Sequence, residues 1–366
     1  MKSPLIFVLA SLLFISFHGL FYKRVIEKLL VSKSIKNALA IFVAINLILN
    51  ILYIVSRYTN IISNTLHYIF SISIGITFVM LMYLILNEIL HLFHTRLKYI
   101  DQSKRNFIKK SGDGLMLAAS AGYVTTAAYE GSKEPVVNVI KLGRFDFSIV
   151  QISDLHIGGL IDQEFVKHSV EKINALTPDL VFITGDFIDT EVESVRDIVL
   201  ELNNIESKYG IYGVLGNHEY FHDPINIIEF MKGTKVKLLL NQNVIIPELK
   251  VNIVGVNDLF GYRIGLLEPN IHEAYKNSNK EYKTILLAHQ PKFISELGSY
   301  TPDLILSGHT HGGQIYPFKH LVKLQQPFVK GLHILPNGSA IYVNSGIGFW
   351  GPPMRLGSQA EIAYLI

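Results

Sequence analysis

The distribution of apolar and polar positions divides this chain into two parts. Three long apolar stretches come first, and they cover approximately residues 4–22, 37–56 and 66–87. As helices, each is long enough to cross about 30 Å of hydrocarbon. A fourth stretch, 114–129, is shorter and rich in Ala, Gly and Thr. We therefore predict a membrane domain over residues 1–134 with three to four transmembrane helices.

Residues 135–366 show a different pattern, in which short apolar runs alternate with amphipathic segments. Helical spacing predicts one helix over 162–176, capped by Asp162, and a second over 191–205. Residues 133–142 are expected to be a polar linker into the first strand. Further strand-like runs follow the second helix. These features predict an α/β fold, a two-sheet β-sandwich flanked by helices.

Composition supports the membrane domain. With 49% hydrophobic residues, 17% charged residues and a mean hydropathy of +0.32, the chain is too apolar for an ordinary soluble protein. Its basic side chains gather in the connections after the first and third apolar stretches. By the positive-inside rule, both connections are cytoplasmic and the amino terminus is outside. If the fourth stretch also crosses, residues 135–366 lie on the outer face of the cytoplasmic membrane.

Charge and residue usage also bear on partners. Residues 135–366 are net acidic and lack interleaved aromatic and basic side chains, so we expect no nucleic-acid binding. The absence of cysteine is compatible with an oxidising exterior. The oligomeric state stays open. Four histidines lie in or beside the apolar stretches, namely His18, His67, His91 and His94. We expect them to pack or to form hydrogen bonds at the interface, rather than to bind a metal or haem.

Five apolar runs of the second part end in side chains that bind metal ions. In chain order these are Asp154 with His156, Asp186, Asn217, His289, and His309 with His311. Ligands gather at the carboxyl ends of strands in α/β sheets, so we expect these side chains to converge. Imidazoles and carboxylates with one amide suit Mn, Fe or Zn, whereas Ca or Mg alone would favour oxygen ligands. Two such ions about 3.5–4 Å apart bind a phosphoryl group and activate water, which is hydrolytic chemistry.

The motifs that carry these side chains are DLH, GDFID, GNHEY, AHQP and GHTHGGQ, in that order. Together they resemble the calcineurin-like metallophosphoesterase superfamily over about residues 137–366. The resemblance implies two metal ions, the first bound by Asp154, His156 and His311, and the second by Asn217, His289 and His309. It also implies that Asp186 bridges them. The residue chemistry agrees, because a neutral imidazole cannot share one lone pair between two cations.

The resemblance further implies the catalytic roles. Asp186 and His218 are the expected catalytic residues, with His218 protonating the leaving oxygen or contacting the phosphate. A neighbouring carboxylate such as Glu219 is expected to orient the His218 imidazole. Asn217 and His218 are also expected to contact the substrate.

A glycine- and proline-rich segment, 344–357, resembles the carboxyl-terminal block of the membrane-anchored branch of the superfamily. That branch includes enzymes similar to UDP-2,3-diacylglucosamine pyrophosphatases. Arg355 is expected to bind a phosphate, or alternatively to pair with Glu361. Phe349 and Trp350 are expected to form a lip that meets acyl chains or the bilayer, or alternatively to pack under a loop.

These observations predict a membrane-anchored, multi-pass bacterial phosphoesterase with two divalent ions, Mn among the candidates. Its expected substrate is a phosphodiester or pyrophosphate of a lipid or nucleotide-linked lipid. Two alternatives stay open, a phosphomonoesterase and a membrane sensor or scaffold that keeps the metal site for binding. Protein-phosphatase activity is disfavoured, because that branch has an arginine in its second motif, where this chain reads GDFIDTE.

Overall fold

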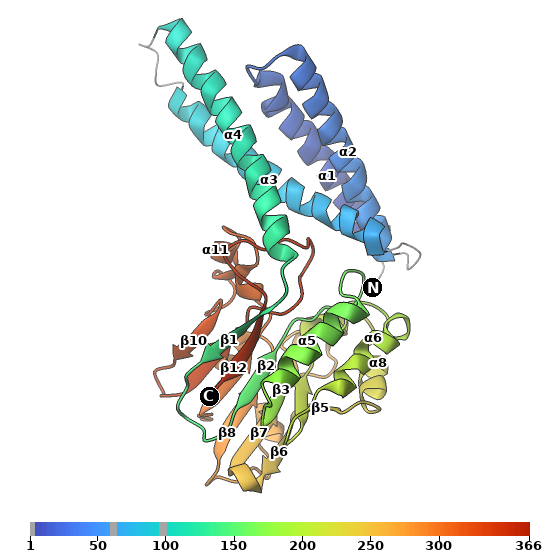
Figure 1. Cartoon of the computed structure of the whole chain (residues 1–366), viewed down its shortest axis with the longest axis vertical. Helices are drawn as coiled ribbons and strands as arrows, with labels where there is room; N and C mark the ends of the chain where they lie inside the picture. The colour runs from blue at the N-terminus through green and yellow to red at the C-terminus, as the bar shows by residue number, and fades with distance from the viewer. Residues whose placement is uncertain (1–3, 59–63, 95–100) are drawn as a thin grey trace. The chain divides into compact units, whose positions relative to one another are not determined.

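The computed structural model describes residues 4–58, 64–94 and 101–366 (Figure 1). By its internal contacts the chain divides into two compact units. The first comprises Met1–Glu130 with the short segment Gly351–Met354, and the second comprises Gly131–Trp350 with Arg355–Ile366.

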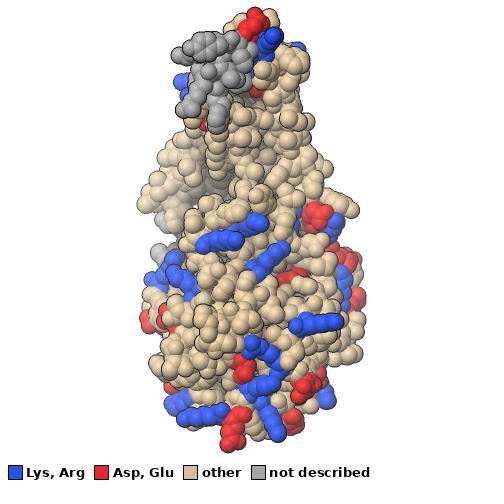
Figure 2. Space-filling model, turned by 90° about the vertical axis from the view of Figure 1, so that its left-hand side faces the viewer, with Lys and Arg blue, Asp and Glu red and all other residues tan. Residues whose placement is uncertain are grey.

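The described part of the first unit contains four long helices. They are α1 (Pro4–Arg24), α2 (Lys33–Tyr58), α3 (Asn64–His94) and α4 (Gln102–Gly131). Three spans are long and apolar enough to cross a membrane, namely Leu5–Lys28, Lys33–Ser56 and Thr65–Leu92. Charged side chains are scarce along the helices on the face seen in Figure 2. The fourth predicted stretch lies in α4, which is one continuous helix but is less apolar than the other three.

Polar contacts join the helices near the end where α1 finishes. The guanidinium of Arg24 on α1 pairs with the carboxylate of Glu88 on α3 at 2.7 Å. The carboxylate of Asp113 on α4 accepts hydrogen bonds from the backbone N–H of Leu30 (2.9 Å) and from Nζ of Lys109 (2.8 Å). The α4 helix is therefore tied to the basic connection between α1 and α2, and from there it runs in the opposite direction to α3 (Figure 1).

Histidines of these helices make hydrogen bonds, as expected. His18 lies buried between the helices, where Nδ1 donates to the carbonyl of Phe14 (2.8 Å) and Nε2 accepts from the amide of Asn46 (3.1 Å). His67 contacts the hydroxyl of Ser56 at 3.1 Å. The side chain of His94 lies outside the described residues.

The second unit contains two six-stranded sheets. In spatial order, the first consists of β1 (Val136–Ile140), β12 (Glu361–Leu365), β2 (Ile149–Ile152), β3 (Leu180–Thr184), β4 (Ile211–Val214) and β5 (Val236–Leu238). The second consists of β10 (Gly331–Ile334), β11 (Ala340–Val343), β9 (Leu304–Ser307), β8 (Lys283–Leu287), β7 (Val251–Gly255) and β6 (Gln242–Ile246). The helices of this unit are α5 (Gln163–Ala175), α6 (Arg196–Leu200), α7 (Asn217–Phe221), α8 (Pro224–Met231), α9 (Gly261–Ile264), α10 (Ile271–Ala274) and α11 (Lys319–Val322).

The core lies between the two sheets, which confirms the predicted sandwich. Phe182 of β3 belongs to the same buried cluster as Ile253 of β7. The next residue along β3, Ile183, points to the other face, where it packs with Val166 of α5. Because successive side chains of a strand alternate between faces, strands that are covered on both sides read as continuous apolar runs.

Two sequence-based expectations for the elements were wrong. The expected linker at 133–142 contains β1, which pairs in parallel with β12, so the chain enters the sheet before its first motif. The expected helix at 191–205 is broken at Val195, whose φ of −129° and ψ of 12° are not helical. It consists of short pieces, 3₁₀ turns at Val192–Ser194 and Glu201–Asn204 on either side of α6. The apolar spacing had correctly identified its buried face, but spacing alone does not show where the backbone kinks.

The sheet topology brings the metal-binding motifs together. The strands β2, β3 and β4 are parallel neighbours in one sheet, and β8 and β9 are parallel neighbours in the other. Between the sheets, the side-chain amide of Gln151 on β2 donates to the carbonyl of Ser307 on β9 at 3.0 Å. The carboxyl ends of strands from both sheets therefore meet at one edge of the sandwich.

Candidate metal centre

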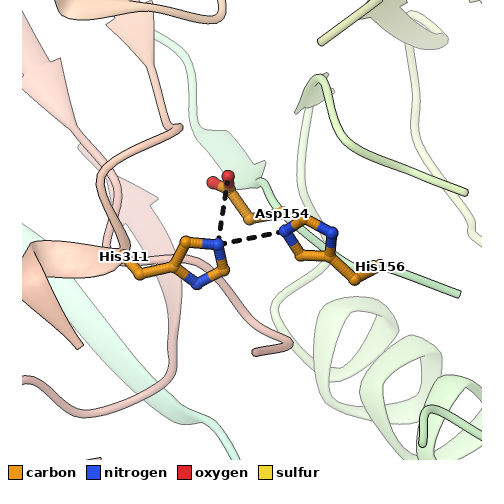
Figure 3. A group of neighbouring side chains, drawn as sticks. All are labelled: Asp154, His156 and His311. Carbon is orange, nitrogen blue, oxygen red and sulfur yellow. Dashed lines mark hydrogen bonds and ion pairs between the residues drawn. The ribbon is translucent and has the colours of Figure 1, made fainter. Parts of the chain in front are cut away.

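The first group at this edge consists of Asp154, His156 and His311 (Figure 3). Their ligand atoms all lie within 4.8 Å of one another, and all three side chains are buried. The Nε2 atoms of His156 and His311 are 3.0 Å apart, and Nε2 of His311 is 3.6 Å from Oδ1 of Asp154. This is the set expected to bind the first ion.

The second group consists of Asp186, His289 and His309, again with ligand atoms within 4.8 Å. Oδ2 of Asp186 lies 3.2 Å from Nε2 of His289 and 3.8 Å from Nε2 of His156. Oδ1 of Asn217 is 3.2 Å from the same His289 nitrogen. The structure thus brings all seven predicted ligands together, with the Asp186 carboxylate between the two groups.

Two of these imidazoles have the neutral form that binds a metal, whereas at His289 burial is outweighed by the Asp186 carboxylate, which raises the pKa. Burial lowers the pKa of His156 to about 4 and that of His309 to about 3, so both imidazoles are neutral at pH 7 and keep a lone pair for a metal. Nε2 of His156 faces Nε2 of His311 at 3.0 Å, so both nitrogens point to the same spot. Nδ1 of His289 donates to the carbonyl of Thr184 at 2.7 Å, which turns its Nε2 toward the centre.

The backbone at this centre has an unusual conformation. A positive φ is rare for residues with a Cβ, yet it occurs at five of the predicted ligands: Asp154 (55°), His156 (51°), Asp186 (53°), His309 (70°) and His311 (49°). Two glycines allow close approach, since a Cβ at Gly216 would collide with the Asp186 carboxylate and one at Gly308 with the Asp154 carboxylate. Left-handed residues gathered in this way are typical of functional sites, where surrounding contacts maintain the strain.

The carboxylate that orients His218 is Asp189, and the expectation of Glu219 was wrong. Nδ1 of His218 lies 2.7 Å from Oδ1 of Asp189. Burial by itself would lower the pKa of His218, but the carboxylates of Asp186 and Asp189 outweigh it and raise the pKa to about 9. Glu219 instead accepts hydrogen bonds from three backbone N–H groups, those of Asp186 (3.1 Å), Ile188 (3.0 Å) and Gly216 (2.7 Å). The available signal was the second carboxylate of the GDFID motif, three residues after Asp186.

Arg355 neither faces a substrate site nor pairs with Glu361, which were the two sequence-based expectations. Its side chain is 1% exposed, and its guanidinium donates to backbone carbonyls rather than facing a substrate. The acceptors within 3.1 Å are the carbonyls of Ser345 (3.1 Å), Gly346 (3.0 Å) and Gly348 (2.5 Å). The Glu361 carboxylate accepts from the backbone N–H of Ser345 (2.7 Å). Arg355 therefore holds the segment after β11 in its path, and the prediction that it binds phosphate was wrong.

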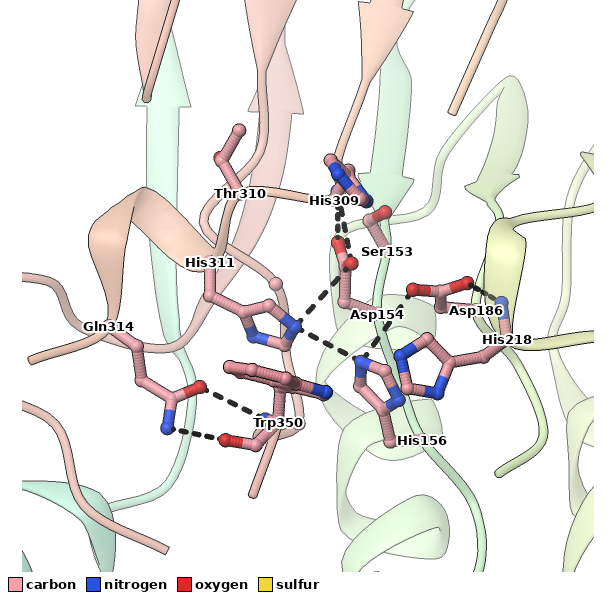
Figure 4. A network of polar contacts seen from close by, with 12 residues as sticks. Ser153, Asp154, His156, Asp186, His218, His309, Thr310, His311, Gln314 and Trp350 are labelled. Atoms are coloured by element: carbon pink, nitrogen blue, oxygen red, sulfur yellow. Dashed lines mark hydrogen bonds and ion pairs between the residues drawn. The ribbon is translucent and has the colours of Figure 1, made fainter. Parts of the chain in front are cut away.

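The two aromatic residues of the predicted lip, Phe349 and Trp350, differ in exposure and in what they contact. The indole of Trp350 is 52% exposed and lies beside His156 and His311 (Figure 4). The side chain of Gln314 holds the Trp350 backbone, because its amide N–H donates to the Trp350 carbonyl (3.0 Å) and its oxygen accepts from the Trp350 backbone N–H (2.9 Å). Phe349 instead packs partly buried against the core on the outer face of the first sheet. Of these two aromatic side chains, Trp350 is thus the one that borders the metal centre.

The chain is similar in sequence to known proteins. The family model described as calcineurin-like phosphoesterase matches residues 147–313. An uncharacterized metallophosphoesterase of Helicobacter pylori is 40% identical over 283 residues, covering 76% of this chain and 74% of that protein. Another from Campylobacter jejuni is 31% identical over 372 residues, 99% and 98% of the two chains. A UDP-2,3-diacylglucosamine pyrophosphatase of Chlamydia muridarum is 29% identical over 322 residues, 68% of this chain and 95% of that protein.

Proposed function

Because the chain belongs to the calcineurin-like metallophosphoesterases and is thus a phosphate-ester hydrolase, we propose that it cleaves a phosphodiester or pyrophosphate of a lipid or nucleotide-linked lipid. The observation that carries the proposal is the meeting of seven predicted ligands from five strand ends, six of them buried and His309 partly so, with one carboxylate between two groups. The likeness to a pyrophosphatase that acts on a nucleotide-linked lipid supports the substrate class. Three helices able to cross a membrane support anchoring.

The residues of the centre have complementary roles in this proposal. Two divalent ions, Mn, Fe or Zn, held by the seven side chains would stabilise charge on the phosphoryl oxygens and lower the pKa of the attacking water. His218 is protonated at neutral pH, and its Nδ1 is held by Asp189, which leaves Nε2 to donate a proton to the departing oxygen. Asn217 precedes His218 in α7, so one short helix presents a metal ligand and the general acid.

We expect cleavage to depend on metal ions. The full chain in detergent would be tested on p-nitrophenyl phosphate, bis-p-nitrophenyl phosphate and a UDP-linked diacyl sugar. Chelation should lower turnover by at least about a hundredfold, because the ions supply both the charge stabilisation and the activated water, and Mn, Fe or Zn should restore it. The measurements are release of p-nitrophenol from the first two substrates and release of UMP from the UDP-linked sugar.

The panel also separates the alternatives. Faster cleavage of the monoester than of the diester and the UDP-linked sugar would favour a phosphomonoesterase. If metal ions bind with the expected stoichiometry but no ester is cleaved, the chain is a binding module and the proposed reaction is wrong.

We also propose that the catalytic domain lies on the outer face of the cytoplasmic membrane. Basic side chains of the first connection, Lys28 and Lys33 among them, favour a cytoplasmic position for that connection. Asp113 of α4 is bound to Leu30 in the same connection. Residues 114–129 then extend about 24 Å as a helix, close to the thickness of the hydrocarbon layer, before the catalytic domain begins.

This location predicts activity on intact cells. Bacteria that produce the chain should cleave externally added bis-p-nitrophenyl phosphate, whose charge keeps it outside, at the same rate before and after lysis. Cells producing the Asp186→Asn variant would give the background. Activity that appears only after lysis would assign the domain to the cytoplasm and leave the proposed reaction unaffected.

A further inference from the structure

An apolar surface adjoins the candidate general acid. Phe221 is the last residue of α7, the helix that carries His218, and the centroids of the two rings are 5.0 Å apart. On its other side Phe221 meets Phe260 edge to face, with centroids 4.9 Å apart. The short helix α9 follows directly and adds Tyr262 and Ile264. We call these four residues the aromatic shelf.

The shelf is exposed to an unusual degree for such side chains. Phe221 is 44% exposed, Tyr262 49% and Ile264 45%, although each would be more stable when buried. The hydroxyl of Tyr262 is already used, because it donates to the carbonyl of Pro269 at 3.2 Å. The four side chains of the shelf therefore offer carbon surface, although the charged Arg263 guanidinium lies 5.8 Å from the centroid of the Phe260 ring. Exposed apolar surface next to a polar site is typical of ligand contact.

The shelf is held rigidly against the metal centre. Phe221 shares α7 with the predicted ligand Asn217. At Phe260, the buried carboxylate of Asp258 accepts from the backbone N–H of Phe260 and from the side-chain amide of Gln290, both at 2.8 Å. Gln290 directly follows the predicted ligand His289. Both halves of the shelf are thus fixed to elements that present metal-binding residues.

We propose that the aromatic shelf binds the acyl or alkyl chain of the substrate, on the side of the leaving group. This rests on the proposed function. The proton donated by His218 goes to the leaving oxygen, so whatever that oxygen carries lies next to Phe221. An aliphatic chain matches the exposed carbon surface of Phe221, Tyr262 and Ile264, and helices long and apolar enough to cross a membrane bring the enzyme to lipids. One end of the substrate is then an anionic phosphate at the metal centre and the other is hydrocarbon on the shelf.

The test compares two substrates that differ only in chain length, the UDP esters of dodecanol and of butanol. The full chain in lipid nanodiscs would be assayed for UMP release in ¹⁸O-water. We expect kcat/KM to be at least about tenfold higher for the dodecyl ester, and the label to enter UMP, because alkyl phosphate is the leaving group. Phe221→Ser and Phe260→Ser should each lower the dodecyl-to-butyl ratio of kcat/KM by about fivefold, which is the usual effect of truncating an aromatic contact. Phe221→Leu should keep most of this ratio.

Leu324→Ser is the matched control, because Leu324 is 81% exposed after α11 and is not part of the shelf. The dodecyl-to-butyl ratio of this variant should equal that of the wild type. Partitioning of the dodecyl ester into the nanodisc is the same for all variants, so it does not change the comparison between them. Equal ratios in the wild type and Phe221→Ser, with unchanged metal content, would overturn the shelf assignment, as would label in the alkyl phosphate. Neither result would affect the proposed function, which is tested separately by whether the wild type cleaves the diester and the UDP-linked sugar.

Discussion

Replacing Asp186 with asparagine is expected to lower turnover roughly a thousandfold or more while leaving the fold intact. The Asp186 carboxylate lies between His156 and His289, within 4 Å of a ligand nitrogen from each group. Asparagine has the same shape but no negative charge, so two neighbouring cations lose the anion that separates them. The measurements are kcat on bis-p-nitrophenyl phosphate, metal content per chain, and circular dichroism.

Asp189→Asn is the matched control, since it removes a charge of the same size three residues away. It should retain both ions and lower kcat by about a hundredfold, because Asp189 contacts His218 and acts on proton transfer. A normal metal content and normal turnover in Asp186→Asn would contradict the bridging role and strengthen the scaffold alternative.

Replacing Arg355 with methionine is expected to lower the free energy of unfolding by about 3 kcal/mol or more. Methionine has nearly the same length but no N–H groups, so the buried carbonyls of Ser345, Gly346 and Gly348 would lose their donor. Urea unfolding of the full chain in detergent would be followed by fluorescence of Trp350, the only tryptophan, which belongs to the same loop. A lower midpoint is the expected result.

Arg263→Met is the comparison for this measurement. Arg263 is exposed at the surface of α9, so its loss should change stability by no more than about 0.5 kcal/mol. If Arg355→Met unfolds at the wild-type midpoint but no longer cleaves substrate, the phosphate-binding role expected from the sequence would be restored.

Much of the fold was predictable because its signals are local. A buried strand must be apolar along its whole length, so the runs that became β3, β8 and β9 were recognisable without knowledge of their neighbours. Each run is followed closely by a predicted metal ligand, so the motif order singled out seven side chains, and the topology of parallel strands predicted that they meet. The three apolar spans were equally evident from length and composition.

The pairing of side chains within the site depended on tertiary structure. Glu219 is next to His218 in the sequence, but α7 turns its carboxylate back to the backbone, and Asp189 arrives from the end of β3 instead. Arg355 follows a motif-like segment, yet the path of that loop surrounds it with carbonyls. The left-handed backbone at five ligands and the contact between Phe221 and Phe260 have no sequence signature. Sequence alone determined which chemical groups occur at the strand ends, because that information lies within a few residues. Only the fold decided which groups face each other, because those distances depend on packing between segments far apart in the chain.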